Sequence, residues 1–437
     1  MYLFSFLAGA CGLTYEVVWS RLAGAHLGDA DTANALVLGT FMGGLALGAR
    51  VFGTKADTLA RPLTAYALLE VAIGAYALLS PTIFSAVPPV GPGAQSVRVG
   101  IVVLGLLPPT ILMGGAFPLL TRYLTRRTVD LRRNVGELYG VNTAGAVLGG
   151  LLAGFVLLDT VRPAGVLAGV GAFNLLLGLA ILRAARGAPD RLPPGETPSE
   201  PAGLADAVAH GPGARRVALA LAAFSGVATM ALEVAWTREL SRLLSSSTEG
   251  LSLMLAAFLT GSALGSWALA SRAAGRFGLP TVVAFALLST SLLLGLARVV
   301  QAMVLGAATG PLPAHLHLTC FALLLLPAIA AGMVFPAAVR LGSDARLLGG
   351  RVGHIYAVNT LGTLAGAVLA GLVVLPALGG GVVFRAVTLA YAVAGLALAR
   401  YAHRDPPGGA RVEATRGERV ESPQSEAANV FSTTVRN

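Results

Sequence analysis

The chain contains one hydrophobic unit twice, with the two copies 217 residues apart. The sequence Tyr-Glu-Val-Val-Trp-Ser-Arg at residues 15–21 returns as Leu-Glu-Val-Ala-Trp-Thr-Arg at residues 232–238. The same offset relates residues 41–48 to 258–265 and residues 136–145 to 353–362, and Phe117-Pro118 matches Phe335-Pro336 at an offset of 218. A duplicated unit of about 185 residues therefore makes up almost the whole chain. Repeats of this size in apolar sequence are typical of transporter folds.

The composition places both copies in lipid. Hydrophobic residues make up 55% of the chain and charged residues only 12%, about half the charge of a typical soluble domain. The only cysteines, Cys11 and Cys320, lie in apolar stretches, so neither a disulfide framework nor a thiolate metal site is expected. We predict no cofactor and no metal site, because His315 and His317 lack a further ligand and no nucleotide-binding loop is present.

Segments of about 20 apolar residues, the length that crosses a bilayer, predict twelve helices. The predicted spans are 2–24, 32–53, 63–85, 98–120, 135–158, 163–182, 217–240, 249–270, 279–300, 315–339, 353–376 and 382–400. They divide the chain into a first six-helix repeat at 1–183, a Pro-rich linker at 184–216, a second repeat at 217–400 and a disordered tail at 401–437.

Basic residues predict the orientation. Of the 31 Lys and Arg residues, 24 lie in or beside the linker, the tail and the loops on one side of the membrane. The positive-inside rule then makes both termini and the linker cytoplasmic, in a bacterial-type inner (plasma) membrane. The net charge of +10 is explained by this topology and by contact with the lipid bilayer, so no nucleic-acid partner is expected.

Six spans in each half mean that both halves enter the membrane with the same polarity. Parallel repeats of this kind are the arrangement of the major facilitator superfamily, in which the solute passes between the halves. The predicted fold class is therefore an all-α membrane protein with twelve transmembrane helices in two parallel six-helix repeats, similar to the major facilitators.

Three motifs in each half also resemble a known family. The Glu-Val-x-Trp-Ser/Thr-Arg, Gly-x-Ala-Leu-Gly and Gly-x-x-Tyr-x-Val-Asn-Thr-x-Gly helices look like the membrane part of the fused major-facilitator/spermidine-synthase proteins. The resemblance implies a link to polyamines and to a soluble aminopropyltransferase domain. Here the soluble segments are too short for that domain, so we expect no enzyme activity in the chain itself; a separate aminopropyltransferase is a possible partner.

Three acids lie well inside predicted spans, where a carboxylate costs about 2.5–3.5 kcal/mol: Glu16, Glu70 and Glu233. Glu16 and Glu233 occupy equivalent positions on the first helix of each half and are predicted to face each other across a central cavity. There they could bind a proton or a cationic solute. Glu70, whose counterpart is Leu287, is a further candidate for proton or substrate binding.

A structural role for the paired acids is the alternative. Each glutamate could be held within its own half by neighbouring side chains: Trp19 and Arg21 in the first half, Trp236 and Arg238 in the second. The acids and these neighbours would then form a packing clasp repeated in each half.

Other pairs in the repeats are candidates for the solute site or for gating. Asn142 and Asn359, with Tyr139 and Tyr356 on the same helix faces, could bind solute, although small neighbours in a Gly-x-x-x-Gly pattern favour helix packing. Pro118 and Pro336 are predicted to break the fourth and tenth helices, either as gating bends or as static ones.

Between the second and third spans, residues 53–61 resemble a degraded facilitator signature. In that signature an acid, here Asp57, pairs with basic residues such as Arg61 in one conformation. An ordinary charged loop is the alternative reading.

Taken together, the sequence predicts a secondary transporter that moves a small solute by alternating access, and the acids of the cavity favour a cationic or amine-bearing one. Two alternatives stay open. The chain could be the membrane subunit of a separate aminopropyltransferase, or a membrane scaffold without a transport cycle.

Overall fold

The computed structural model describes residues 1–27, 30–86, 94–127, 131–187, 212–243, 247–271, 278–307, 316–343 and 348–404. Within these ranges the regular structure is helical throughout. The first half contains α1 (Tyr2–Leu27), α2 (Ala30–Ala56), α3 (Pro62–Ser85), α4 (Gln95–Arg127), α5 (Leu131–Leu152), η1 (Ala153–Leu157), α6 (Leu158–Thr160) and α7 (Pro163–Gly187). The second half contains α8 (Pro212–Leu243), α9 (Ser247–Ala270), α10 (Leu279–Ala307), α11 (Leu316–Ala331), α12 (Val334–Gly342), α13 (Leu348–Val368), η4 (Leu369–Val374), α14 (Leu375–Leu378) and α15 (Gly380–Arg404).

Each half is a bundle with the same internal pairings. In the first half α1 packs on α5, α2 on α4 and α3 on α7; in the second half α8 packs on α13, α9 on α11 and α10 on α15. These pairs occupy equivalent places in the repeat. The duplication predicted from the sequence is therefore present in the packing.

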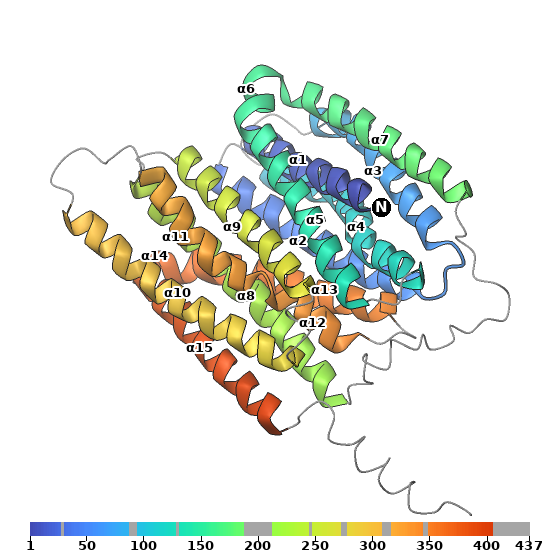
Figure 1. Ribbon diagram of the computed structural model, residues 1–437. Coiled ribbons are helices and arrows are strands. Elements are labelled where there is room, and N and C mark those ends of the chain that lie inside the picture. The colour runs from blue at the N-terminus through green and yellow to red at the C-terminus, as the bar shows by residue number, and fades with distance from the viewer. Residues whose placement is uncertain are drawn as a thin grey trace, which may run out of the picture.

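The two bundles meet along a seam that is formed by two equivalent helix pairs. α2 packs along α13, and the equivalent helices α9 and α5 pack along each other. In Figure 1 the blue-to-green half and the yellow-to-red half lie side by side, and α1 and α8 both begin near the right-hand end of the molecule. Reciprocal contact of this kind is the mark of a two-fold relation between like units. We call the end at which α1 begins and α15 ends the terminal face.

Eleven helical segments of the described chain are long and apolar enough to cross a bilayer. They correspond to eleven of the twelve predicted spans, and the 27-residue α2 lies at the place of the other one. The predicted linker is shortened by α7, which continues to Gly187, and by α8, which begins at Pro212. The rest of that linker, and the tail from residue 405, fall outside the described residues, so their predicted disorder stays a prediction.

The fourth span is not broken, contrary to the prediction from its prolines. α4 is one helix of 33 residues that continues through Pro108, Pro109 and Pro118. Pro109 cannot donate to the Gly105 carbonyl, which instead accepts a hydrogen bond from the Tyr76 hydroxyl of α3. Neighbouring side chains therefore satisfy the carbonyl that the proline leaves open, as membrane helices commonly allow.

The tenth span is broken as predicted, between α11 and α12. The helix stops at Ala331 and restarts at Val334, two residues before Pro336. At the break the Gly332 carbonyl accepts a hydrogen bond of 3.2 Å from the Ser266 hydroxyl of α9. Because a hydroxyl supplies the donor that the helix lacks here, the break is compatible with a buried position.

The fifth and eleventh spans each contain a π-helical turn that the sequence did not predict. η1 and η4 follow α5 and α13 at matching positions of the repeat, since residues 153 and 370 are 217 apart. π turns inside α-helices frequently mark functional segments. Their presence in both halves shows that both repeats use the same local distortion.

Glycines bring the helices of each half into close contact, as the Gly-x-x-x-Gly spacing predicts. A methyl group at Gly145 would lie 1.9 Å from the Phe6 carbonyl oxygen of α1, and one at Gly149 would lie 2.0 Å from that of Ala10. The equivalent glycines of α13, Gly362 and Gly366, approach α8 in the same way. No side chain fits at these four positions without separating the helices.

Candidate functional site

Two carboxylates of the repeat approach each other across the seam. Glu16 lies on α1 and Glu233 at the equivalent place on α8, and the two side chains are close enough to interact electrostatically. Both are half-buried in the bundle. At 1.5 Å per residue Glu16 stands about 21 Å from the start of α1, which is deep within the bilayer span.

Neither carboxylate is held by its own helix in the way the clasp hypothesis requires. The Trp19 indole N–H donates to Ser80 of α3 at 3.2 Å, and the Thr237 hydroxyl donates to the backbone carbonyl of Glu233 at 2.8 Å. Within the described part of the chain, no hydrogen bond or ion pair reaches the carboxylate of Glu16 or Glu233.

The neighbours that the clasp would use have other positions. Trp19 is fully buried and stacks on Tyr15 with ring centroids 5.2 Å apart, while Trp236 contacts Phe384 edge to face at 4.8 Å. Both tryptophans therefore pack inside their own half. Arg21 and Arg238 are exposed, and neither forms an ion pair with a described residue.

Four aromatic rings form a cluster on the seam beside these acids. We call this set, Phe117 of α4, Tyr139 of α5, Phe335 of α12 and Tyr356 of α13, the aromatic cluster. Its closest pair, Tyr139 and Phe335, has ring centroids 4.8 Å apart, and the Phe117 and Tyr356 rings are 5.6 Å apart. Each of these contacts joins one half to the other, so the cluster closes the seam at this depth.

The aromatic cluster and the acids are neighbours. Tyr139 interacts electrostatically with Glu233, and Tyr356 does so with Glu16. Tyr139 lies eight residues after the start of α5, or about 12 Å from the terminal face, so the cluster stands between that face and the deeper carboxylates. Acids and rings together comprise three repeat-related pairs, which meet at the pseudo-two-fold axis.

Glu70 lies elsewhere, inside the first half. It is 3% exposed on α3, where its side chain interacts with Tyr66 and with Asn174 of α7. The Asn174 amide also donates to the Glu70 backbone carbonyl at 3.0 Å. The structure thus separates Glu70 from the paired acids of the seam, and a role for it in proton movement stays a prediction.

Asn142 and Asn359 lie where helices pack within each half. A methyl group at Gly9 of α1 would fall 2.2 Å from the Asn142 carbonyl oxygen, and one at Gly226 of α8 would fall 2.1 Å from that of Asn359. The two contacts are equivalent in the repeat. This position matches the helix-packing alternative more closely than a solute contact.

Asp57 connects the two halves at the terminal face. Its two carboxylate oxygens accept hydrogen bonds from the backbone N–H groups of Gly349 and Gly350, at 2.8 and 2.7 Å. These are the first-turn amides of α13, where a helix favours negative charge. Arg122 of α4 lies 3.6 Å from the same carboxylate, whereas Arg61 is an exposed residue at the start of α3. In this conformation the basic residue beside Asp57 is Arg122, and a conformation-dependent role of Arg61 stays a prediction.

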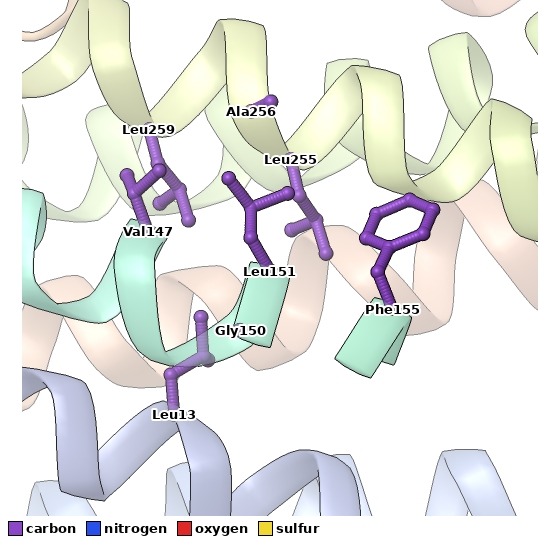
Figure 2. A pocket seen from close by; sticks show the side chains of 8 residues that line it. All are labelled: Leu13, Val147, Gly150, Leu151, Phe155, Leu255, Ala256 and Leu259. Carbon is purple, nitrogen blue, oxygen red and sulfur yellow. The ribbon is translucent and has the colours of Figure 1, made fainter. Parts of the chain in front are cut away.

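A small gap lined by apolar side chains lies between α1, α5 and α9. Its volume is about 20 Å³, and Figure 2 shows Leu13, Leu151 and Leu255 pointing toward one another around it. A space of this size holds about one water molecule, and the side chains that line it are all apolar. We therefore exclude it as a solute site.

Known structures identify this arrangement. The human organic anion transporter MFSD10 (TETRAN) is similar at a TM-score of 0.58 and 16% identity, over 91% of this chain and 98% of that one. The proton:xylose symporter XylE bound to 6-bromo-6-deoxy-D-glucose is similar at 0.57 and 12%, over 93% and 95%. A double-tryptophan XylE variant gives 0.60 and 14%, over 92% and 94%. The chain has the major facilitator fold. No protein-family model matches the sequence, and neither does any curated protein.

The two acids and the four rings of the aromatic cluster are the six residues that meet at the seam. Sequence reasoning named four of these six residues as site candidates, namely Glu16, Glu233, Tyr139 and Tyr356, but treated Phe117 and Phe335 only as markers of the repeat. It also missed Arg122 as the partner of Asp57. The sequence did mark both phenylalanines, because Phe117 and Phe335 are equivalent aromatic residues of the repeat.

Proposed function

We propose that the chain is a secondary transporter for a small cationic or amine-bearing solute, which binds between Glu16 and Glu233. The observation that carries the proposal is the pair of carboxylates on the seam that no described hydrogen bond or ion pair satisfies. A half-buried charge at this depth of a membrane span is costly without a partner, and a cation arriving from solution would reduce that cost.

The aromatic cluster supports the same class of solute. An ammonium group held near the faces of Phe, Tyr or Trp rings gains about 0.5–2 kcal/mol from cation–π attraction. Four rings stand next to the two acids, on the side of the terminal face. An amine between them would touch negative charge on one side and ring faces on the other.

Alternating access would then consist of opening and closing the seam between the two halves. The aromatic cluster and Asp57 close the terminal face in the conformation described, and by the distribution of basic residues we propose that this face is cytoplasmic. Release of the solute to that side requires Asp57 to leave α13 and the rings to separate. Opening of a hinged seam around a fixed central site is the usual mode of parallel-repeat transporters.

Uptake into proteoliposomes with an imposed pH gradient and a panel of amines, including polyamines, tests the proposal. Glu16→Gln and Glu233→Gln should each reduce uptake at least tenfold, since each removes a charge that contacts the solute. A proton and an amine compete for the same carboxylates, so the apparent affinity for the amine should fall as the pH falls.

The matched control is Asp159→Asn, which removes an exposed acid at the opposite end of the bundle. This variant should transport like the original chain. Correctly folded Glu16→Gln and Glu233→Gln proteins with unchanged flux would remove both acids from the solute path. Glu70→Gln in the same assay tests whether that residue moves protons.

The resemblance to the fused spermidine-synthase proteins favours polyamines within the panel and supports a second candidate. In that case the chain would serve as the membrane subunit of a separate aminopropyltransferase. Co-purification of such an enzyme with the chain, together with no amine uptake, would favour this alternative.

A further inference from the structure

The terminal face contains a cavity of about 320 Å³ that lies apart from the paired acids. Four basic side chains line it: Arg50 of α2, Arg215 of α8, and Arg351 and His354 of α13. The cavity therefore has walls from both halves of the molecule. Its volume is at the lower end of the range for small-ligand sites.

The positive charge in this cavity is concentrated. Arg50 and Arg215 both lie close enough to His354 to interact electrostatically with it, although they belong to different halves. Asp57 is the one acid among the lining residues, and its two oxygens already accept hydrogen bonds from α13. Three guanidinium groups thus line the same cavity as one carboxylate, and that carboxylate already accepts two hydrogen bonds from the backbone of α13.

The repeat shows that the fold does not need these cations. The residues 217 positions away are Trp267 for Arg50, Asn134 for Arg351 and Glu137 for His354. The equivalent helices α9 and α5 pack along each other without them. Neutral and acidic counterparts at these three places indicate that the contact between the helices does not itself require a cation there.

We propose that this cavity binds a phosphate group, with Arg50 of the first half and Arg215 and Arg351 of the second as its ligands. Arginine matches the geometry of phosphate with two parallel N–H donors, and a bound anion offsets the mutual repulsion of the cations. The phosphate belongs either to a soluble phosphate or to the headgroup of an anionic phospholipid. Because it bridges the halves beside Asp57, the anion stabilises closure of the terminal face. This site is independent of the solute proposed for the seam.

The test uses the purified full-length chain in two arms at constant ionic strength. In detergent, inorganic phosphate is titrated against chloride, and binding is followed by calorimetry and by the thermal unfolding midpoint. In nanodiscs, phosphatidylcholine alone is compared with phosphatidylcholine containing phosphatidylglycerol, and lipid retention is followed by native mass spectrometry. A ligand that binds only the folded state raises the midpoint, and the rise grows with the logarithm of the ligand concentration once that exceeds the dissociation constant.

Arg50→Gln and Arg351→Gln should each weaken binding about tenfold, since each removes one charge-assisted contact. Arg351→Lys keeps the charge but not the paired donors, so it should fall between the original chain and Arg351→Gln. Arg183→Gln and Arg186→Gln are the matched controls, because both remove an exposed charge at the end of α7 on the same face, and they should bind normally.

The arms distinguish the sources. Phosphate binding in detergent assigns the site to a soluble anion, and retention of phosphatidylglycerol without phosphate binding assigns it to a headgroup. The proposal is overturned if neither ligand binds better than its chloride or phosphatidylcholine reference. It is also overturned if the α7 controls lose as much binding as the cavity variants.

Discussion

The two interfaces that join the halves are copies of each other, yet they differ in how they are held. In both, a helix from the second position of one repeat packs along a helix from the fifth position of the other: α2 with α13, and α9 with α5. At the first interface the Gly53 and Gly353 backbones meet so closely that a methyl group at Gly353 would lie 2.1 Å from the Ala49 carbonyl oxygen. At the second, a methyl group at Gly136 would lie 2.9 Å from the Ser266 carbonyl oxygen.

Polar contacts differ more than packing does. Asp57 binds two backbone N–H groups of α13 across the first interface, but the residue 217 positions later is Ala274. Arg122, the partner of Asp57, has its equivalent in Arg340, which donates to the Leu269 carbonyl at 3.2 Å within its own half. The packing of helix on helix is thus common to both interfaces. The hydrogen bonds of Asp57 to the backbone of α13 belong to the α2–α13 interface.

Replacement of Asp57 by alanine should have the largest effect on this difference. It removes two hydrogen bonds and the carboxylate beside Arg122, both side chains being less than 10% exposed, so a loss of about 3–5 kcal/mol in the closed conformation is expected. Spin labels placed on α2 and α13 at the terminal face should report a longer distance. Labels on α9 and α5 provide the control, and an unchanged distance across the first interface would contradict the role given to Asp57.

Alanine at Gly353 should cost more than alanine at Gly136. Overpacking costs about 1–3 kcal/mol, while alanine gains about 1 kcal/mol over glycine in a helix. At Gly353 the clash is with backbone and should dominate, but at Gly136 the looser contact leaves the two effects nearly balanced. Thermal unfolding of the two variants in the same detergent measures the difference. Equal midpoints would mean that the two interfaces are packed alike.

Arg340→Gln should have the smallest effect of the three. It weakens one hydrogen bond to the Leu269 carbonyl, which corresponds to about 1 kcal/mol, and it leaves the contact between halves in place. The unfolding midpoint should therefore fall slightly while the spin-label distances stay the same. Opening of the terminal face by this substitution would show that the second half also has a polar connection across the seam.

Much of the fold could be predicted from the sequence, because lipid imposes a strong pattern. The repeat, the span lengths and the glycine spacing each constrain one level of structure, and together they predict two parallel six-helix repeats with close helix contacts, as the structure shows. The same reasoning predicted that Glu16 and Glu233 face each other. They are equivalent residues on the first helix of each half, and that helix was expected to border the central cavity on the pseudo-two-fold axis.

Other features could not be predicted, because they depend on residues that are distant in the sequence. Asp57 finds its amide donors 292 and 293 residues later, and no local pattern marks Gly349 as their source. The break predicted for α4 at Pro118 was wrong, because the helix continues through all three of its prolines; at Pro109 the open Gly105 carbonyl is satisfied by Tyr76, which lies on another helix. The phosphate cavity likewise collects side chains from three helices, each of which is an ordinary basic residue in its own segment.

The interruption between α11 and α12 means that one ring of the aromatic cluster follows a helix break, whereas another lies in a continuous helix. Phe335 belongs to a nine-residue helix attached through Gly332 and Met333, whereas Phe117 lies within the unbroken 33 residues of α4. A rotation about that short connection would withdraw the Phe335 ring from Tyr139 while the rest of α11 kept its place. Opening toward the terminal face should accordingly start with the second repeat, even though the two repeats share one ancestral design.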